Sequence, residues 1–230
     1  VSSPNYLESS SVLREFRDKC QLVPYGIDRR RFLSASPEQG LAIRSRYGGG
    51  PLLLFVGVLR YYKGLSYLLE ALPKIPARLL IVGEGPMKES LLAQADALRL
   101  GDKIIFAGRV ADEDLPAYYR AADLFVLPAS ERSEAYGLVQ LEAMSSGLPV
   151  VCTELGTGTS YVNLHGESGL VVPPRDPGAL AEAITALLTD HALRRRLAVG
   201  ALARSELFTV ERMLAGISAV YSQVILYPKS

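Results

Sequence analysis

Short, continuous apolar runs alternate along this chain with longer stretches whose apolar residues recur every three or four positions. The continuous runs are rich in Leu, Ile and Val, which is typical of parallel strands covered on both faces. Strands are predicted at residues 21–23, 52–56, 78–82, 103–106, 124–127, 149–152 and 170–172. The helical periodicity predicts helices at 65–72, 87–98, 115–122, 135–146 and 179–188, with two more at about 193–207 and 210–221.

This strand–helix alternation predicts an α/β fold, a Rossmann-like three-layer domain with a parallel sheet and helices on both faces. Residues 1–36 do not follow it cleanly and offer one helix at about 6–18, a short strand and a turn at 23–28. We therefore divide the chain into a linker or domain remnant at 1–36, a Rossmann-like domain at 37–205 and a C-terminal helical segment at 206–230.

In open parallel sheets, ligands bind beyond the carboxyl ends of the strands. That rule predicts a site built from the loops 57–64, 83–86, 108–112 and 128–137, with 155–160 as a further candidate. The segment 134–142 begins in one of these loops and continues into a predicted helix, so we expect it to carry the most information about function.

A helix beginning near Ala135 would place the free N–H groups of Gly137, Leu138 and Val139 in its first turn. Unpaired amides and the positive end of the helix dipole attract an anion such as phosphate. Glu142, roughly 12 Å along the axis from Glu134 at 1.5 Å per residue, could accept hydrogen bonds from ribose hydroxyls. The alternative is that the helix dipole alone explains an acidic residue at the helix N-terminus, and that Glu142 is simply solvated.

Arg60 and Lys63 stand in the loop 57–64, between a strand and the start of a helix. Basic side chains at that position oppose the helix dipole, and an anionic ligand would resolve the conflict. The alternative is that both side chains extend into solvent.

Five other features have weaker implications. The tight turn 83–86 predicts close backbone passage beneath a ligand, and Asp112 is predicted to be the N-cap of the following helix rather than a metal ligand, so no metal site is assigned. The segment 156–160 could wrap an oxyanion or form a plain turn. His165 is expected to be structural and His191 to lie at the surface.

The composition is 49% hydrophobic and 21% charged, with a net charge of +1 over 230 residues. It describes a globular protein and argues against a general nucleic-acid binder. Cys20 and Cys152 share no motif, so we expect a reducing compartment and a cytoplasmic location. No apolar run is long enough for a membrane span. The chain starts at Val1 without an initiator Met, and we expect it to be part of a longer protein.

The chain resembles the C-terminal, donor-binding domain of retaining GT-B glycosyltransferases of the family 4 type, closest to bacterial rhamnosyl- and mannosyltransferases. The shared landmarks keep the family's order and lie at residues 23–28, 57–64, 82–86, 106–110, 134–150 and 169–174.

The resemblance implies roles for the matching residues. Lys63 and a basic partner, Arg60, would hold the donor diphosphate, and Glu134 would contact the transferred sugar; these three are the catalytic candidates. The implied donor-binding residues are Gly57, Gly108, Arg109, Val110, Tyr136, Gly137, Leu138, Val139 and Glu142. The donor would be a UDP- or GDP-sugar, and no cofactor or metal is expected.

Two departures from the family pattern stand in the site. The family carries Arg directly after the glycine equivalent to Gly57, whereas this chain has Val58, so Arg60 would have to supply the charge from another direction. The segment before His165 has Thr159, Ser160 and Tyr161 in place of the family's common acidic residue.

The predicted function is transfer of a hexose from a nucleoside-diphosphate sugar to a hydroxyl acceptor with retention, in bacterial surface-polysaccharide synthesis. The acceptor, a sugar or lipid-linked molecule, would be bound by an N-terminal domain preceding residue 1, which could also associate with a membrane surface. Alternatives are a non-catalytic nucleotide-sugar-binding domain and a GT-B-type sugar-nucleotide epimerase. The epimerase would need acid–base carboxylates and a histidine in the cleft, and this chain has only two histidines.

Overall fold

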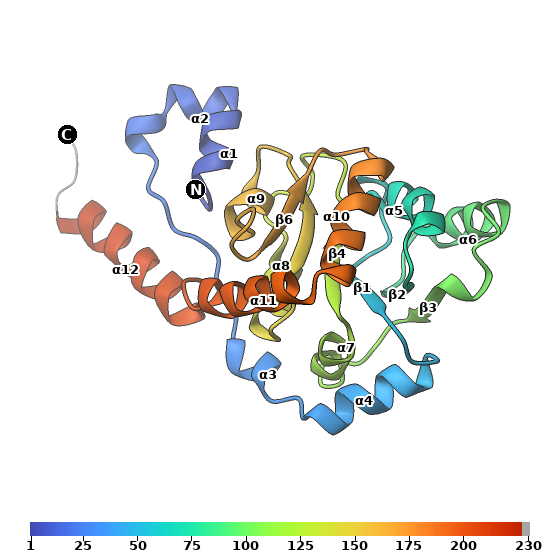
Figure 1. Ribbon diagram of the computed structural model, residues 1–230. Helices are drawn as coiled ribbons and strands as arrows, with labels where there is room; N and C mark the ends of the chain where they lie inside the picture. The colour runs from blue at the N-terminus through green and yellow to red at the C-terminus, as the bar shows by residue number, and fades with distance from the viewer. Residues whose placement is uncertain (227–230) are drawn as a thin grey trace.

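Six parallel strands form a single sheet at the centre of the computed structural model, which describes residues 1–226 (Figure 1). The spatial order is β3-β2-β1-β4-β5-β6. The strands are β1 (Leu52–Val56), β2 (Arg78–Val82), β3 (Ile104–Gly108), β4 (Leu124–Leu127), β5 (Val150–Thr153) and β6 (Gly169–Val172). The order reverses between β1 and β4, so the chain leaves these two neighbouring strands toward opposite faces.

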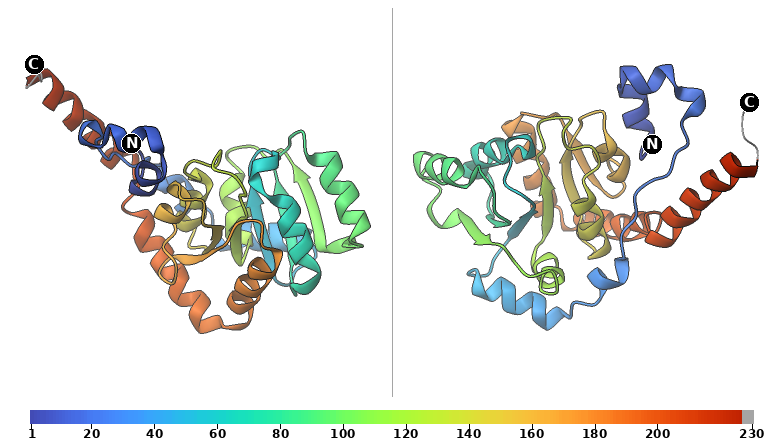
Figure 2. Two further views of the ribbon diagram at one scale, coloured as in Figure 1. Left: turned by 90° about the horizontal axis from the view of Figure 1, so that it is seen from above. Right: turned by 180° about the vertical axis from the view of Figure 1, so that it is seen from behind.

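Helices cover both faces of the sheet (Figures 1 and 2). One layer holds α5 (Leu65–Ala71), α6 (Lys88–Ala97) and α10 (Pro177–Thr189), and the other holds α3 (Arg29–Leu33), α4 (Pro37–Arg46), α7 (Leu115–Ala121) and α8 (Leu138–Ser145). Next to β5 and β6 lie α9 (Gly158–Val162) and α11 (His191–Ser205). The predicted three-layer Rossmann-like fold is confirmed.

The apolar runs are continuous because the central strands have no solvent face. Every residue of β1, β4 and β5 is buried, whereas the edge strand β3 is half-buried throughout. Side chains of both helical layers meet these strands in one core. The sheet therefore supplies a rigid platform whose carboxyl edge holds the loops predicted to bind a ligand.

The N-terminal segment differs from the prediction. The single helix expected at 6–18 is wrong: α1 (Pro4–Ser9) and α2 (Ser11–Glu15) are separated by Ser10, which has an extended backbone and caps α2 with its hydroxyl. The strand predicted at 21–23 is also wrong, because this stretch joins no sheet and its Val23 N–H donates to the Val1 carbonyl at 2.9 Å. Neither α3 nor α4 is predicted by the sequence pattern.

The described part of the chain closes with α12 (Val210–Leu226), which projects from the layered body in all views (Figures 1 and 2). Its start is tied to the segment 23–28: the Ile27 N–H donates to the Phe208 carbonyl at 3.0 Å, and the Val210 N–H donates to the Ile27 carbonyl at 3.3 Å. Short 3₁₀ turns complete the fold at Arg17–Lys19, Tyr61–Lys63, Leu72–Lys74 and Gly101–Lys103. The division at residues 36 and 206 stays a prediction.

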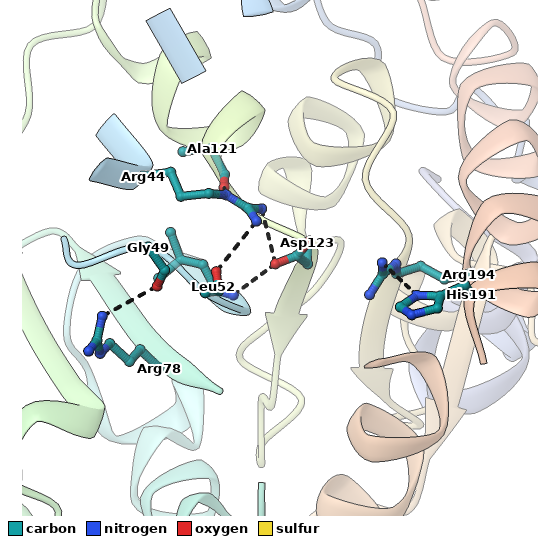
Figure 3. A network of polar contacts seen from close by, with 9 residues as sticks. Arg44, Gly49, Leu52, Arg78, Ala121, Asp123, His191 and Arg194 are labelled. Carbon is teal, nitrogen blue, oxygen red and sulfur yellow. Dashed lines mark hydrogen bonds and ion pairs between the residues drawn. The ribbon is translucent and has the colours of Figure 1, made fainter. Parts of the chain in front are cut away.

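A polar network ties α4 to the amino ends of the strands, at the edge opposite the candidate site (Figure 3). The Asp123 carboxylate accepts from the Leu52 N–H at 2.8 Å and pairs with Arg44 at 3.0 Å, and Arg44 also donates to the Ala121 carbonyl at 2.8 Å. These contacts fix where β1 and β4 begin relative to each other.

At the carboxyl edge, the loops that follow β1 and β4 pack backbone against backbone. A Cβ atom at Gly64 would lie 1.9 Å from the Pro128 carbonyl oxygen, and Gly64 has a φ of +67°. The Ser130 N–H also donates to the Tyr62 carbonyl at 2.8 Å. Only glycine permits both the left-handed backbone and this approach of the two loops.

We expect Gly64→Ala to destabilise the protein more than Gly49→Ala, measured as the free energy of unfolding in urea. Gly49 has a matching φ of +68°, but a Cβ atom there would meet no other atom within 4 Å. Both substitutions carry the left-handed strain of about 1–2 kcal/mol. Gly64→Ala should cost a further ~1–3 kcal/mol from overpacking. Equal losses would show that the loop contact contributes nothing.

Candidate donor-binding site

The contact between the two loops brings Lys63 and Glu134 together. Lys63 closes the 3₁₀ turn after β1, and Glu134 lies in the segment between β4 and α8. The Lys63 ammonium donates to the Glu134 carboxylate, with residue exposures of 9% and 7%. The sequence-based hypothesis assigns these side chains to different parts of one ligand, and the structure joins them as a buried ion pair.

Helix α8 begins at Leu138, so the predicted start near Ala135 is wrong. The physical reason is Gly137, which occupies the N-cap with a left-handed φ of +77° and turns the chain sharply before the first helical residue. Within residues 1–226, the N–H groups of Gly137, Leu138 and Val139 have no hydrogen-bond acceptor. The candidate anion-binding amides are therefore present, while Glu134 stands in the preceding loop rather than at the helix mouth.

A neighbouring loop fixes the backbone around Glu134, and the sequence does not predict its role. The buried Thr157 hydroxyl donates to the Glu134 carbonyl at 2.9 Å, and the Gly158 N–H donates to the Ala135 carbonyl at 2.8 Å. The only signal is the Thr/Gly-rich run at 156–160, which is compatible with an oxyanion loop or a plain turn. It instead forms the start of α9, and its hydrogen bonds hold the backbone of residues 134 and 135.

The Tyr136 side chain lies in the core. Its ring meets Tyr25 edge to face at 5.1 Å, and its hydroxyl donates to the Tyr25 carbonyl at 3.3 Å. Burial raises the pKa of Tyr136 well above its ordinary value. This predicted donor-binding residue therefore anchors the segment 23–28 with its side chain, and its backbone alone borders the free amides.

A cavity of about 430 Å³ adjoins the loop after β1. Its lining includes three of the predicted donor-binding residues, Gly57, Arg109 and Val110, together with Val58 and Gly83. The turn after β2 passes directly under the first loop: a Cβ atom at Gly83 would lie 2.0 Å from the Gly57 carbonyl oxygen. The glycine-rich turn is thus explained by contact with the neighbouring loop as well as by its position in the cavity wall.

Glu142 is mostly buried inside α8, where its carboxylate accepts a hydrogen bond from the Tyr119 hydroxyl at 2.7 Å. Burial is the main cause that raises the pKa of Glu142 above its ordinary value, while the Tyr119 hydrogen bond and the Arg31 guanidinium act in the opposite direction and the Asp112 carboxylate adds a smaller upward effect. The carboxyl group of Glu142 is therefore easier to protonate than that of an exposed glutamate. Asp112 lines the cavity, whereas Glu142 is not among its lining residues.

The prediction that Asp112 is the N-cap of α7 is wrong. Asp114 occupies that position, and its side chain makes no capping hydrogen bond. The Asp112 carbonyl instead accepts from Arg31, which draws α3 toward the cavity wall.

The remaining predicted side chains have the following surroundings. Arg60 is exposed at the start of the turn Tyr61–Lys63, and Gly108 ends β3 with its carbonyl accepting from the Gly83 N–H at 2.8 Å. His191 is exposed at the start of α11, and the His165 ring accepts from the Val171 N–H at 3.1 Å, so both histidines behave as expected.

Two further properties hold for residues 1–226. No three His, Cys, Asp or Glu side chains converge in a way that would hold a metal ion. None of the helices in this part of the chain combines the length and apolar character that a membrane crossing requires.

The profile of the family Glycosyl transferases group 1 matches residues 41–203, and the chain belongs to this family. It has the fold of the C-terminal domain of GT-B glycosyltransferases of the family 4 type, as the resemblance implied.

Two curated relatives and one solved structure illustrate the similarity. A D-rhamnosyltransferase, WbpZ of Pseudomonas aeruginosa, is 44% identical over 80% of this chain and 48% of its own length. O-antigen chain mannosyltransferase C of Escherichia coli is 34% identical over 98% of this chain and 60% of its own length. The crystal structure of Anabaena HepE in complex with UDP is 25% identical with a TM-score of 0.82, covering 88% of this chain and 57% of that one. The chain thus spans about half the length of the curated relatives.

We expect Lys63→Met to lower the free energy of unfolding by about 3–5 kcal/mol, because it leaves the buried Glu134 carboxylate without its partner. The matched control is Arg175→Met, which breaks the more exposed Arg175–Glu131 pair and should cost at most ~1 kcal/mol. A Lys63→Met/Glu134→Leu double variant should recover most of the loss. Equal, small losses for both single variants in urea denaturation would contradict a buried pair.

Proposed function

We propose that this chain binds a nucleoside-diphosphate sugar and is the donor-binding part of a retaining hexosyltransferase. The observation that carries the proposal is the buried Lys63–Glu134 pair beside the free amides of residues 137–139, where the strand order reverses. A cation and unpaired amides suit a diphosphate, and a carboxylate suits sugar hydroxyls. The adjoining cavity of about 430 Å³ would take the nucleoside.

In this proposal the protein stabilises the leaving group electrostatically. Negative charge that builds on the departing diphosphate would be met by Lys63, by Arg60 and by the amides at the start of α8. Glu134 would orient the transferred sugar, and Glu142 would accept from the ribose. A phosphate oxygen of the leaving group would assist deprotonation of the acceptor, so no side chain is assigned as general base.

The relatives suggest which process the reaction serves. Their names describe a D-rhamnosyltransferase and an O-antigen chain mannosyltransferase, which supports transfer of a hexose or deoxyhexose in bacterial surface-polysaccharide synthesis. The complex of HepE with UDP supports a nucleoside diphosphate as the ligand class. We place the reaction in the cytoplasm or at the cytoplasmic face of the membrane, with the acceptor bound by an additional N-terminal domain.

Titration of the 230-residue chain with UDP-, GDP- and ADP-sugars tests the proposal. The nucleotide-sugar with the preferred base should bind the folded state and raise the melting temperature, by an amount that grows with RT ln(1 + [L]/Kd). The same chain should transfer sugar far more slowly than a protein that also carries an acceptor domain. No shift of the melting temperature with any donor would refute the proposal. Rapid turnover by this chain alone would refute the assignment of acceptor binding to a separate domain.

We expect nucleotide-sugar affinity to fall as the pH is lowered from neutrality into the acidic range, because burial raises the pKa of Glu142 and its carboxylate is therefore protonated at a higher pH than that of an exposed glutamate. A protonated carboxyl group loses acceptor capacity toward the ribose hydroxyls. Glu142→Gln should bind more weakly at pH 7 and show a flatter pH profile in calorimetric titration. Using a nucleotide-sugar avoids the terminal phosphate of a free diphosphate, which itself titrates with a pKa of about 6 and would distort the profile. Parallel profiles for both proteins would remove Glu142 from the site.

A further inference from the structure

The Lys63–Glu134 pair joins two side chains that the proposed function assigns to different parts of the donor. Lys63 would serve the diphosphate and Glu134 the sugar, yet the ammonium donates to the carboxylate directly. A diphosphate that binds Lys63 must therefore share that cation with Glu134 or displace it, and in either case it brings its own negative charge next to the buried carboxylate. The affinity for the ligand then depends on whether the ligand also supplies a hydrogen-bond partner for the Glu134 carboxylate.

Both side chains are only about one-tenth exposed, at 11% and 9%. Water cannot readily replace a lost partner at such a site, so separating the pair is unfavourable unless each group gains a new one. A nucleotide-sugar offers both replacements: phosphate oxygens for Lys63 and sugar hydroxyls for Glu134. A nucleoside diphosphate offers only the first, which leaves the carboxylate buried and uncompensated.

The surrounding backbone keeps the two groups within reach of each other. The Thr157 hydroxyl and the Gly158 N–H hold the carbonyls of Glu134 and Ala135, and the close approach of Gly64 to Pro128 holds the Lys63 turn. The Lys63 ammonium also lies 5.5 Å from the ring centre of Tyr62, which limits the directions open to it. Glu134 therefore stays within reach of the Lys63 ammonium even when a ligand separates the two groups.

We propose that Glu134 favours release of the nucleoside-diphosphate product by reclaiming Lys63 once the sugar has left. This role rests on the proposed function and goes beyond orientation of the sugar. Glu134 thereby sets a preference for nucleotide-sugar over free nucleotide, and Lys63 is the group through which the preference acts.

The test compares binding of free UDP and free GDP to the wild type and to Glu134→Gln by calorimetry, using the nucleotide that binds the wild type more tightly. Glu134→Gln should bind it about tenfold or more tightly, because a charge-assisted contact to Lys63 is no longer contested. Its dissociation, followed by stopped flow, should slow in proportion. The nucleotide-sugar should gain less or lose affinity.

The matched control is Glu131→Gln, which removes the same charge from the same loop but from a carboxylate paired with Arg175. Its nucleotide affinity should change by less than about twofold, since Glu131→Gln leaves the Glu134 N–H to Glu131 carbonyl bond of 3.0 Å intact and removes only a solvent-screened charge. An equal gain in both variants would show a general charge effect and overturn the proposal. An unchanged or weaker affinity in Glu134→Gln alone would also overturn it.

A second measurement covers the case in which Glu134→Gln does not fold. In wild-type protein with ¹⁵N-labelled lysine, addition of the nucleoside diphosphate should move the Lys63 ammonium signal, assigned by its loss in Lys63→Arg. A static signal under saturating nucleotide would overturn the proposal. Failure of the wild type to bind any nucleotide-sugar as well as any free nucleotide would instead refute the proposed function itself, so the two failures are distinguishable.

Discussion

The candidate site depends on a buried ion pair that is stable only where two loops are held together. Lys63 and Glu134 are 71 residues apart in the chain, and each would be unfavourable alone at its depth in the protein. The mutual contact offsets that penalty, but only if the loops after β1 and β4 keep their relative positions. The rest of the carboxyl edge can be understood as the set of constraints that keeps them there.

Those constraints begin in the sheet. Because β1 and β4 are neighbours at the reversal of strand order, the loops that follow them start side by side. At the opposite edge, Asp123 ties the start of β4 to that of β1 through Arg44 and the Leu52 amide (Figure 3). At the carboxyl edge, the absence of a side chain at Gly64 allows the two backbones to touch. Each device acts on position, and together they leave the two charged side chains little freedom.

Much of this fold follows from sequence because its strongest signals are local. Continuous apolar runs predict the six strands of the sheet, since strands buried on both faces need apolar residues at every position. The N-terminal segment is predicted poorly because its structure comes from caps and from contacts with distant residues, such as the bonds between Ile27 and the turn before α12. Periodicity carries no record of such contacts.

The site shows the same division. Glycine-rich loops, two basic residues and two glutamates can be predicted to lie at the carboxyl edge, since parallel strands place their following loops there. The hydrogen-bond and ion-pair partners of these residues cannot be predicted in this way. The start of α8 is misplaced because a glycine in the left-handed conformation looks like any other glycine in sequence. Support of Glu134 by Thr157 is equally hidden, because a threonine hydroxyl in a polar run has many possible acceptors.

The two glutamates of the segment 134–142 illustrate why spacing alone does not define roles. Glu134 pairs with the Lys63 ammonium, which compensates its negative charge. Glu134 can leave Lys63 only where another partner replaces it. Glu142 accepts a hydrogen bond from the Tyr119 phenol in a mostly buried setting, and burial raises its pKa although that hydrogen bond acts in the opposite direction. Two residues of one type, eight positions apart, are thus prepared for different chemistry by their surroundings. In the proposed function, Glu134 would respond to a competing anion and Glu142 to protons, and a ligand that contacts both would have to satisfy both conditions at once.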